Sequence, residues 1–263
     1  MYYIERKSKI LELLQEERSV SVDSLAMAFD VSKETIRRDL RQMESEGLLT
    51  RTHGGAVPLT TAFTAPAPSP AEPPVDIRST FNKDIKHSLC RKAASYIKEG
   101  DNVYIDNSST TVYLAQYIPE NIQVTFITNS ISFLIESSQL NNPNLTFVCL
   151  GGILNTNNLS TYGNIALRNS HDYFPNKAFL SCTGISEERQ ITDSSINEVD
   201  IKKEMIHRAK EVFILSDHTK FNKNGQIFLS NIENIHHIIT DPIVDSYSHN
   251  FIDRSHTDII FAE

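Results

Sequence analysis

A proline-rich segment divides this chain into two parts of different character. Residues 58–75 read PLTTAFTAPAPSPAEPPV, with a single charged residue, Glu72. Because each proline fixes φ and removes a backbone donor, such a segment is typical of a semi-extended linker and not of a helix or a sheet. We therefore expect a small domain over residues 1–57, a linker over 58–77 and a larger domain over 78–263.

Composition narrows the class of protein. The 263 residues are 40% hydrophobic and 22% charged, which is ordinary for soluble globular domains. No apolar run approaches the roughly 20 residues that span a bilayer, and the amino-terminal segment is charged, unlike a signal peptide. The three cysteines lie far apart, which fits reduced thiols in a cytoplasmic protein. With a net charge of -8, any contact with DNA must be local.

The amino-terminal part predicts three helices, of which the last two are joined by a very short turn. The first is expected over about 4–16, and the second begins after Ser21, a good N-cap. Asp30 and Val31 form the turn before the third helix, expected over about 33–46. Two short helices joined this tightly have the geometry of a helix-turn-helix.

The third predicted helix carries its basic residues on one face. Ile36, Leu40 and Met43 would face the core, which leaves arginine side chains outward. Arginine can read guanine edges, and a helix N-terminus favours phosphate. The following segment, LLTRTHGGAV, has a Gly-Gly turn and is typical of a wing along the DNA backbone or in the minor groove. The residues that we expect to contact DNA are Ser32, Lys33, Thr35, Arg37, Arg38, Arg41, Arg51 and His53.

The charge count leaves a second interpretation open. Residues 1–57 hold nine lysines and arginines against ten aspartates and glutamates, so a helical dimerisation module with a solvated charged face is the alternative. The concentration of positive charge over 33–41 favours DNA binding.

Beyond the linker, short apolar runs alternate with helical-period stretches. Runs such as 103–105, 124–128 and 212–216 predict strands, and stretches such as 81–98 and 197–209 predict helices. This alternation predicts an α/β domain with a mainly parallel sheet that is covered on both faces. Ligands of such sheets bind at the carboxyl ends of the strands, beside the turns that follow.

Polar or small residues follow several of these predicted strands. In the strongest candidate, Asp106 precedes four hydroxyl residues at the expected start of a helix over about 110–117. Hydroxyls and backbone N–H groups there could hold an anion such as a sugar phosphate, while Asp106 would accept hydrogen bonds from sugar hydroxyls. A helix cap without a ligand is the alternative. The residues expected at this edge are Asp106, Ser108, Ser109, Thr110, Thr111, Thr128, Asn129, Gly151, Gly152, Thr183 and Gly184.

The amino-terminal pattern resembles the helix-turn-helix signature of DeoR-family repressors, which implies sequence-specific binding to a double-stranded DNA operator. Asp39, an unusual residue on a helix that meets DNA, belongs to the family pattern. We expect it to orient Arg37 or Arg38 by an ion pair, or to anchor the helix to its neighbours. The matching residues, followed by the wing-like RTHGGAV, are Arg6, Ile10, Leu14, Ser32, Thr35, Ile36, Arg37, Arg38, Asp39 and Leu40.

Roughly residues 78–240 resemble the DeoR-family effector domain, whose fold is similar to ribose-5-phosphate isomerase. The resemblance implies a phosphorylated sugar or polyol as effector and adds Lys202 and Lys220 to the site; for Lys202, a helix ion pair with Glu198 is the alternative. The chain departs from the family at 107–109, where a glycine is usual, and in its longer, proline-richer linker. The matching residues are 106–111, Thr128, Asn129, Gly151, Gly152, Gly163, Thr183, Gly184, Lys202 and 217–221.

These patterns predict a transcriptional regulator that represses a sugar or polyol catabolic operon and responds to a phosphorylated sugar. A sugar-phosphate isomerase with a DNA-binding head is the alternative, because Asp, Glu and Lys side chains near a phosphate could transfer protons; a fold alone does not carry that activity. One small head buries little surface on DNA, so we expect a homodimer or homotetramer. We expect no catalytic residue, no cofactor and no metal site, since nothing has zinc-ligand spacing and the pair His236-His237 fits a surface or core position.

Overall fold

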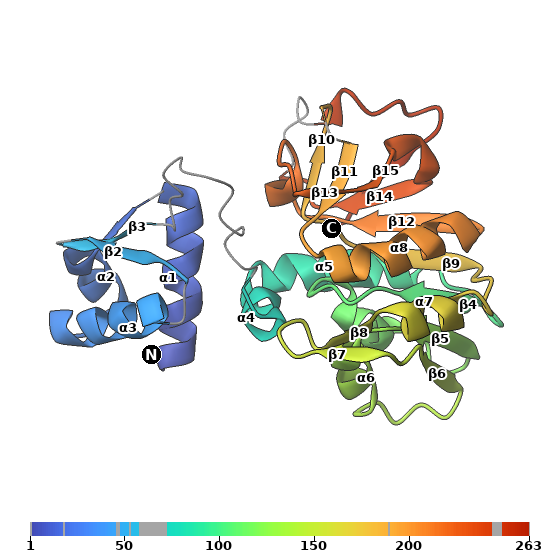
Figure 1. Cartoon of the computed structure of the whole chain (residues 1–263), viewed down its shortest axis with the longest axis horizontal. Helices are drawn as coiled ribbons and strands as arrows, with labels where there is room; N and C mark the ends of the chain where they lie inside the picture. Colours follow the sequence, from blue (N-terminus) through green and yellow to red (C-terminus); the bar gives the residue numbers. More distant parts are fainter. Residues whose placement is uncertain are drawn as a thin grey trace. The chain divides into compact units, whose positions relative to one another are not determined.

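The computed structural model forms two compact units, Met1–Phe81 and Asn82–Glu263, which Figure 1 colours from blue to red along the chain. No helix in the described part of the chain is long and apolar enough to cross a membrane. The structure describes residues 2–17, 19–45, 48–52, 54–57, 73–188, 190–243 and 249–262.

The first unit is a three-helix domain with a small antiparallel sheet. Strand β3 lies between β1 and β2, and the β2–β3 hairpin is the predicted wing. The elements are α1 (Tyr3–Glu17), β1 (Val20–Ser21), α2 (Val22–Phe29), α3 (Lys33–Ser45), β2 (Thr50–Thr52) and β3 (Gly55–Val57). The predicted winged helix-turn-helix is therefore confirmed.

Side-chain caps begin α2 and α3, and a left-handed residue ends α2 in the tight turn between them. The Ser21 hydroxyl accepts a hydrogen bond from the Ser24 N–H at 3.0 Å, and the Ser32 hydroxyl accepts one from the Thr35 N–H at 3.1 Å. Asp30 ends α2 with a φ of 53°, in the left-handed region that aspartate tolerates better than most residues. These caps begin both helices where the sequence predicted.

One apolar core holds the first unit together. Within the sheet, Gly55 lies so close to β1 that a Cβ there would stand 1.8 Å from the Val20 carbonyl oxygen. Only glycine therefore lets β1 pair with β3. The fully or nearly fully buried core includes Ile10, Leu14, Val20, Leu25, Phe29, Ile36, Leu40, Met43 and Leu49.

Helix α4 (Val75–Thr80) begins inside the predicted linker, so residues 75–77 are helical and not extended. Ile77 and Phe81 pack against the core of the first unit, and the Thr80 hydroxyl lies 2.8 Å from that of Ser8. These contacts explain why the first unit reaches Phe81. Residues 58–72 of the predicted linker lie outside the described residues.

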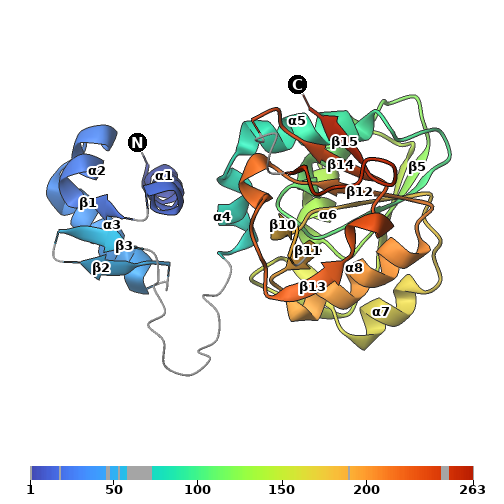
Figure 2. The same cartoon turned by 90° about the horizontal axis from the view of Figure 1, so that it is seen from above.

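A seven-stranded parallel sheet forms the centre of the second unit, in the order β15-β14-β12-β9-β4-β5-β6. Figures 1 and 2 show helices on both of its faces, and the α/β prediction is confirmed. The strands are β4 (Asn102–Ile105), β5 (Val124–Thr128), β6 (Leu145–Cys149), β9 (Lys177–Leu180), β12 (Glu211–Leu215), β14 (His237–Thr240) and β15 (Asp258–Phe261).

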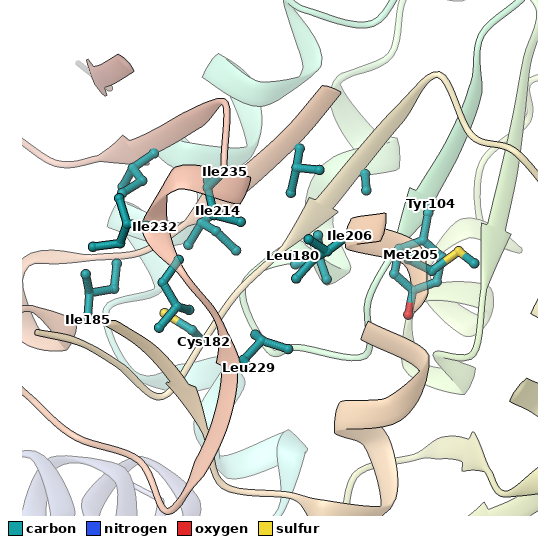
Figure 3. Close-up of a cluster of buried hydrophobic side chains, with 14 of the residues drawn as sticks. Tyr104, Leu180, Cys182, Ile185, Met205, Ile206, Ile214, Leu229, Ile232 and Ile235 are labelled. Atoms are coloured by element: carbon teal, nitrogen blue, oxygen red, sulfur yellow. The ribbon is translucent and has the colours of Figure 1, made fainter. Parts of the chain in front are cut away.

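Alternating side chains of the central strands supply two separate cores. Val103 and Ile105 of β4 face one core, together with Leu89 of helix α5 (Lys83–Ala94). Tyr104, between them, faces the other core with Met205 of helix α8 (Ile196–Arg208), as Figure 3 shows. Strands that are buried on both faces read as nearly continuous apolar runs, which is why they could be predicted.

Shorter elements connect the strands. The predicted helix after Asp106 is a 3-10 helix, η1 (Thr111–Tyr117). A β7–β8 hairpin and a small β10-β11-β13 sheet are further elements that the sequence did not predict. The remaining elements are α6 (Ile131–Ser137), β7 (Ile153–Asn155), β8 (Ser160–Tyr162), α7 (Asn164–Ser170), β10 (Gly184–Ser186), β11 (Gln190–Asp193), η2 (His218–Lys220), β13 (Ile227–Ser230) and η3 (Ile232–Asn234).

The order in which the chain adds strands reverses beside β4. After β4 the chain adds β5 and β6 on one side, and then β9, β12, β14 and β15 on the other. The connections that leave the neighbouring strands β4 and β9 therefore diverge. In open α/β sheets this point, at the carboxyl ends of the strands, is where ligands bind.

Candidate functional site

Helix α3 carries an exposed basic face. Lys33, Arg37, Arg38 and Arg41 are exposed, whereas the apolar side of the helix is buried in the core of the first unit. Arg51 is exposed on β2 of the wing. His53, also predicted to contact DNA, lies outside the described residues.

Most of these cations are paired with carboxylates on the same surface. Exposed pairs of this kind stabilise a protein by only about 0–1 kcal/mol, so a DNA phosphate can replace the carboxylate. The pairs are Lys33–Asp23 at 3.0 Å, Arg37–Glu34 at 3.5 Å, Arg41–Glu34 at 3.1 Å and Arg51–Glu44 at 3.7 Å.

Asp39 anchors α3 to α1. Its carboxylate is 2% exposed and accepts hydrogen bonds from Arg6 Nε at 2.7 Å and Nη2 at 3.2 Å. The hydrogen bond to Asp39 raises the pKa of the Arg6 guanidinium above its ordinary value against the opposing effect of burial. Of the two roles predicted for Asp39, the structure shows the anchoring one.

In the second unit, Asp106 follows β4 and is fully buried. Its Oδ1 accepts hydrogen bonds from the Ser108 N–H at 3.1 Å and the Thr111 hydroxyl at 2.6 Å. Its Oδ2 accepts one from the Ser181 N–H at 2.9 Å and lies 2.9 Å from Lys202 Nζ. Because a carboxylate has about four acceptor positions, Asp106 is fully used in joining the ends of β4 and β9.

Lys202 of α8 is held between two carboxylates. Its Nζ lies 2.9 Å from Asp106 Oδ2 and 2.7 Å from Asp193 Oδ2, and it donates to the Ser181 carbonyl at 3.2 Å. These three contacts use the three donors of an ammonium group. Burial would lower the pKa of Lys202, but the two aspartates raise it well above its ordinary value, so the side chain is charged.

Glu198, the alternative partner predicted for Lys202, binds a different part of the structure. Its carboxylate accepts hydrogen bonds from Asn155 Nδ2 at 3.0 Å, from Asn158 Nδ2 at 2.9 Å and from the Ser160 hydroxyl. Helix α8 is therefore tied to the β7–β8 hairpin through Glu198, and to the end of β4 through Lys202.

A second buried lysine, Lys86 of α5, reaches the turn after β4 and was not among the predicted residues. The side chain is 4% exposed overall, and its Nζ donates to the Ser109 hydroxyl at 3.1 Å. Lys86 shares one helical face with the buried residues Leu89, Cys90 and Ala93. A lysine on the apolar face of a helix is unusual, and that position is the sequence signal that could have identified it.

Thr128 and Asn129, which follow β5, bond to neighbouring segments. The Thr128 hydroxyl donates to the Ile105 carbonyl at 2.7 Å. Asn129 Oδ1 accepts a hydrogen bond from the Tyr104 hydroxyl at 3.0 Å, and its Nδ2 donates to the Thr161 carbonyl at 3.0 Å. Asn129 therefore connects the end of β5 to β8 and keeps one amide hydrogen beyond these two bonds.

Two of the predicted glycines, Gly152 and Gly184, stand at close approaches between backbones, whereas a Cβ on Gly151 would have no atom within 4 Å. Gly151 and Gly152 have φ values of 70° and 116°, and a Cβ on Gly152 would stand 2.5 Å from the Tyr162 carbonyl oxygen. A Cβ on Gly184 would stand 2.2 Å from the Lys223 carbonyl oxygen. In this structure, the close approach that Gly152 and Gly184 permit is to other parts of the same chain.

Lys220 is half-buried in η2, after β12. Its charge acts on Asp217: burial would raise the pKa of that carboxyl, but Lys220 and hydrogen bonds from Thr219 bring it below its ordinary value. The hydroxyl of Thr183, which follows β9, lies 3.5 Å from Asp193 Oδ1.

The predicted effector residues other than Lys202 thus stand at one edge of the sheet, because they follow the carboxyl ends of β4, β5, β6, β9 and β12. Lys202 reaches the same edge from α8 through Asp106. Direct hydrogen bonds join Asp106 to Ser108, Thr111 and Lys202. The structure adds Asp193 and Lys86, which the sequence analysis did not predict, to this group of residues. Within the described residues, no group of three or more His, Cys, Asp or Glu side chains is placed to hold a metal ion.

Comparison with known proteins gives two family matches. The DeoR-like helix-turn-helix domain matches residues 6–62, and the DeoR C terminal sensor domain matches residues 81–242. Among solved structures, ribose 5-phosphate isomerase A from Methanocaldococcus jannaschii matches 53% of this chain and 54% of its own, with 18% identity and a TM-score of 0.38, which is a distant likeness.

Relatives match along almost their whole length. The chain is 34% identical over 248 residues to the uncharacterized HTH-type transcriptional regulator YulB of Bacillus subtilis (strain 168), covering 94% of this chain and 92% of that protein. It is 30% identical to the HTH-type transcriptional regulator GolR of Listeria innocua, over 92% of this chain and 91% of that protein. It is also 30% identical to the HTH-type transcriptional regulator IolR of Bacillus subtilis (strain 168), over 92% of this chain and 93% of that protein.

A winged helix-turn-helix followed by a parallel α/β sensor domain defines a DNA-binding transcriptional regulator. The chain belongs to the DeoR family of such regulators. Membership in this family places it among regulators and not among sugar-phosphate isomerases.

Proposed function

We propose that this protein represses an operon for the breakdown of a sugar or polyol, and that a phosphorylated sugar controls it from the carboxyl edge of the sensor sheet. Two relatives support the sugar assignment through their names. One is a putative aga operon transcriptional repressor of Escherichia coli O157:H7, 27% identical. The other is the L-fucose operon activator of Haemophilus influenzae, 30% identical.

The pairing of Lys86 with Ser109 is the observation that carries the proposal. It places a buried cation 3.1 Å from a hydroxyl at the point of the sheet where ligands of open α/β folds bind. A phosphate group prefers this combination of ammonium and hydroxyl donors. Lys86, Ser109 and the neighbouring Thr110 would bind the phosphate, and the remaining amide hydrogen of Asn129 would bind a sugar hydroxyl.

The other predicted residues take a different role in this proposal. Asp106, Ser108, Thr111 and Lys202 use their hydrogen-bonding groups on one another, so they would position the turn and not contact the effector. Lys220 remains a candidate for the opposing charge, because it is half-buried at the same edge of the sheet.

We also propose that two or four copies act together on the operator, in the cytoplasm. A single small DNA-binding module buries only about 600–1,000 Å² on DNA, which is too little for strong specificity. Sedimentation velocity with and without operator DNA measures the number of copies. A single copy bound per operator would contradict this part of the proposal.

A thermal-shift panel tests the effector. The full chain is melted with pentose and hexose phosphates, with their unphosphorylated sugars and with inorganic phosphate. At 100 times its Kd, a ligand of the folded state adds about 2.7 kcal/mol, which raises the Tm by roughly 5–10 °C for a domain of this size. We expect one phosphosugar to produce this shift and its unphosphorylated sugar to produce none.

Ser109→Ala provides the variant for this panel, and Ser95→Ala, an exposed serine after α5, is its control. The first change removes a hydroxyl that would donate a hydrogen bond to the phosphate of the effector. The rise in Tm with the best ligand should therefore fall by more than half in Ser109→Ala, while Ser95→Ala should keep the full rise. An equal shift with the unphosphorylated sugar, or full retention by Ser109→Ala, would place the effector site elsewhere.

A further inference from the structure

Glu34 lies in the middle of the outward face of α3. A helix turns by about 100° per residue, which places Glu34 between Arg38 and Arg41 on the side of the helix opposite the buried Ile36 and Leu40. The Glu34 side chain is 67% exposed. An acidic group therefore occupies the part of the helix surface that would enter a groove of DNA most deeply.

Its carboxylate contacts two of the arginines expected to bind DNA. Oε1 accepts a hydrogen bond from Arg41 Nη2 at 3.1 Å, and Oε2 lies 3.5 Å from Arg37 Nη1. Glu34 thus neutralises part of the positive charge of both arginines while the protein is free.

Contact with the DNA backbone gives this carboxylate no favourable partner, because phosphates repel it. The major groove does offer partners, since cytosine N4 and adenine N6 are amino donors and glutamate typically accepts from cytosine. In helix-turn-helix proteins the first residues of the recognition helix contact base edges, and Glu34 is the second residue of α3. We propose that Glu34 is a specificity-determining residue that accepts a hydrogen bond from a cytosine amino group of the operator and weakens binding to other DNA. The inference rests on DNA binding through α3.

The discrimination comes from what replaces the ion pairs of Glu34. On the operator, Arg37 and Arg41 move to phosphate or guanine, and the freed carboxylate accepts from cytosine. On unrelated DNA no cytosine amino group stands at the position that the carboxylate reaches, so it stays on the arginines and reduces the charge that they present. A repulsive element against the wrong partner thus increases specificity as much as a new contact with the right one.

The test uses the full chain and an operator selected by the wild-type protein from random duplexes. The Kd values for this operator and for a shuffled duplex are measured for wild type, Glu34→Ala and Glu34→Gln. Glu34→Ala should bind the shuffled duplex more tightly than the wild type does. The slope of its log affinity against log salt concentration should be steeper, by the amount that about one additional phosphate contact contributes. Its preference for the operator should fall roughly 5- to 100-fold, the discrimination that one good base contact supplies.

Repeating the selection with Glu34→Gln identifies the base. Glutamine pairs with adenine through N6 and N7, so the sequence that this variant selects should replace a cytosine by adenine at one position in each half-site. Glu12→Gln, an exposed glutamate on α1, makes the same change in charge and should alter neither selectivity nor the selected sequence.

Two results would overturn the inference. Unchanged preference and an unchanged selected sequence for both Glu34 variants would make Glu34 a solvated residue without contact to DNA. Equal effects of Glu12→Gln would assign the change to net charge alone. Because Glu34 is exposed, both variants should keep the Tm of the wild type, which separates an effect on recognition from an effect on folding.

Discussion

At the scale of single residues, buried charges organise the sensor site. Lys202 stands between Asp106 and Asp193, residues that lie 96 and 9 positions before it in the chain. Asp106 and Lys202 could be predicted because they follow a strand or match a family pattern. The contacts among them could not, since no local pattern records which distant side chains meet. The position of Lys86 on the apolar face of α5 was a sequence signal, but its contact with Ser109, 23 positions away, could not be predicted for the same reason.

Replacing Lys202 with Met should destabilise the protein strongly. The change leaves the Asp106 and Asp193 carboxylates buried without their cation, and removing one partner of a buried pair destabilises by about 3–5 kcal/mol. Urea unfolding followed by circular dichroism measures the loss. Lys203→Met, an exposed neighbour, should change stability by less than about 0.5 kcal/mol. A stable Lys202→Met variant with weakened effector binding would instead make Lys202 a ligand contact.

Stability should fall as the pH drops from 7.5 to 5.5. Burial lowers the pKa of His87 and of His237 below the ordinary value, and neighbouring Lys83 lowers that of His87 further. The unfolded chain therefore binds protons more tightly than the folded protein does. The stability that the two neutral histidines contribute is lost as the pH falls below the unfolded pKa of about 6.5 and through their lower folded pKa. Melting curves across this range measure the loss, and His87→Gln should make it smaller. A Tm independent of pH would contradict the assignment.

At the scale of elements, prediction succeeded where a periodic pattern ran through a whole helix or strand. The parallel strands are apolar runs, and α2 and α3 begin at serine caps. The β7–β8 hairpin was missed because its strands are three residues each and are held by distant partners such as Glu198. Helix α4 was missed because it follows prolines and is stabilised by the packing of Ile77 and Phe81 on the first unit.

Gly55→Ala should disrupt the wing, whereas Gly54→Ala should not. A Cβ on Gly55 would stand 1.8 Å from the Val20 carbonyl oxygen, while a Cβ on Gly54 would have no atom within 4 Å. The β1–β3 pairing must therefore open in the first variant, and both the Tm and the affinity for operator DNA should fall. We expect a loss of at least 1–3 kcal/mol, as for other overpacked sites. Equal behaviour of the two variants would mean that the wing tolerates separation from β1.

At the scale of the whole molecule, the proposed function assigns DNA binding and effector binding to different units, Met1–Phe81 and Asn82–Glu263. The DNA-binding face carries both signs of charge, and the chain has a net charge of -8, so affinity for DNA in general should be low. Regulation then requires a free energy of coupling between two sites that share no residue.

The size of the coupling can be predicted, together with a variant that weakens effector binding alone. Coupling energies between such sites are typically about 1–3 kcal/mol, so a saturating effector should change operator affinity by roughly 5- to 150-fold. By thermodynamic linkage, the operator must change effector affinity by the same factor. Ser109→Ala should weaken effector binding. It should not alter operator affinity in the absence of effector, because Ser109 lies in the second unit. Titrations of the effector with and without operator measure both factors. Unequal factors would reveal a further bound state, and an operator affinity indifferent to every phosphosugar would contradict control by such an effector.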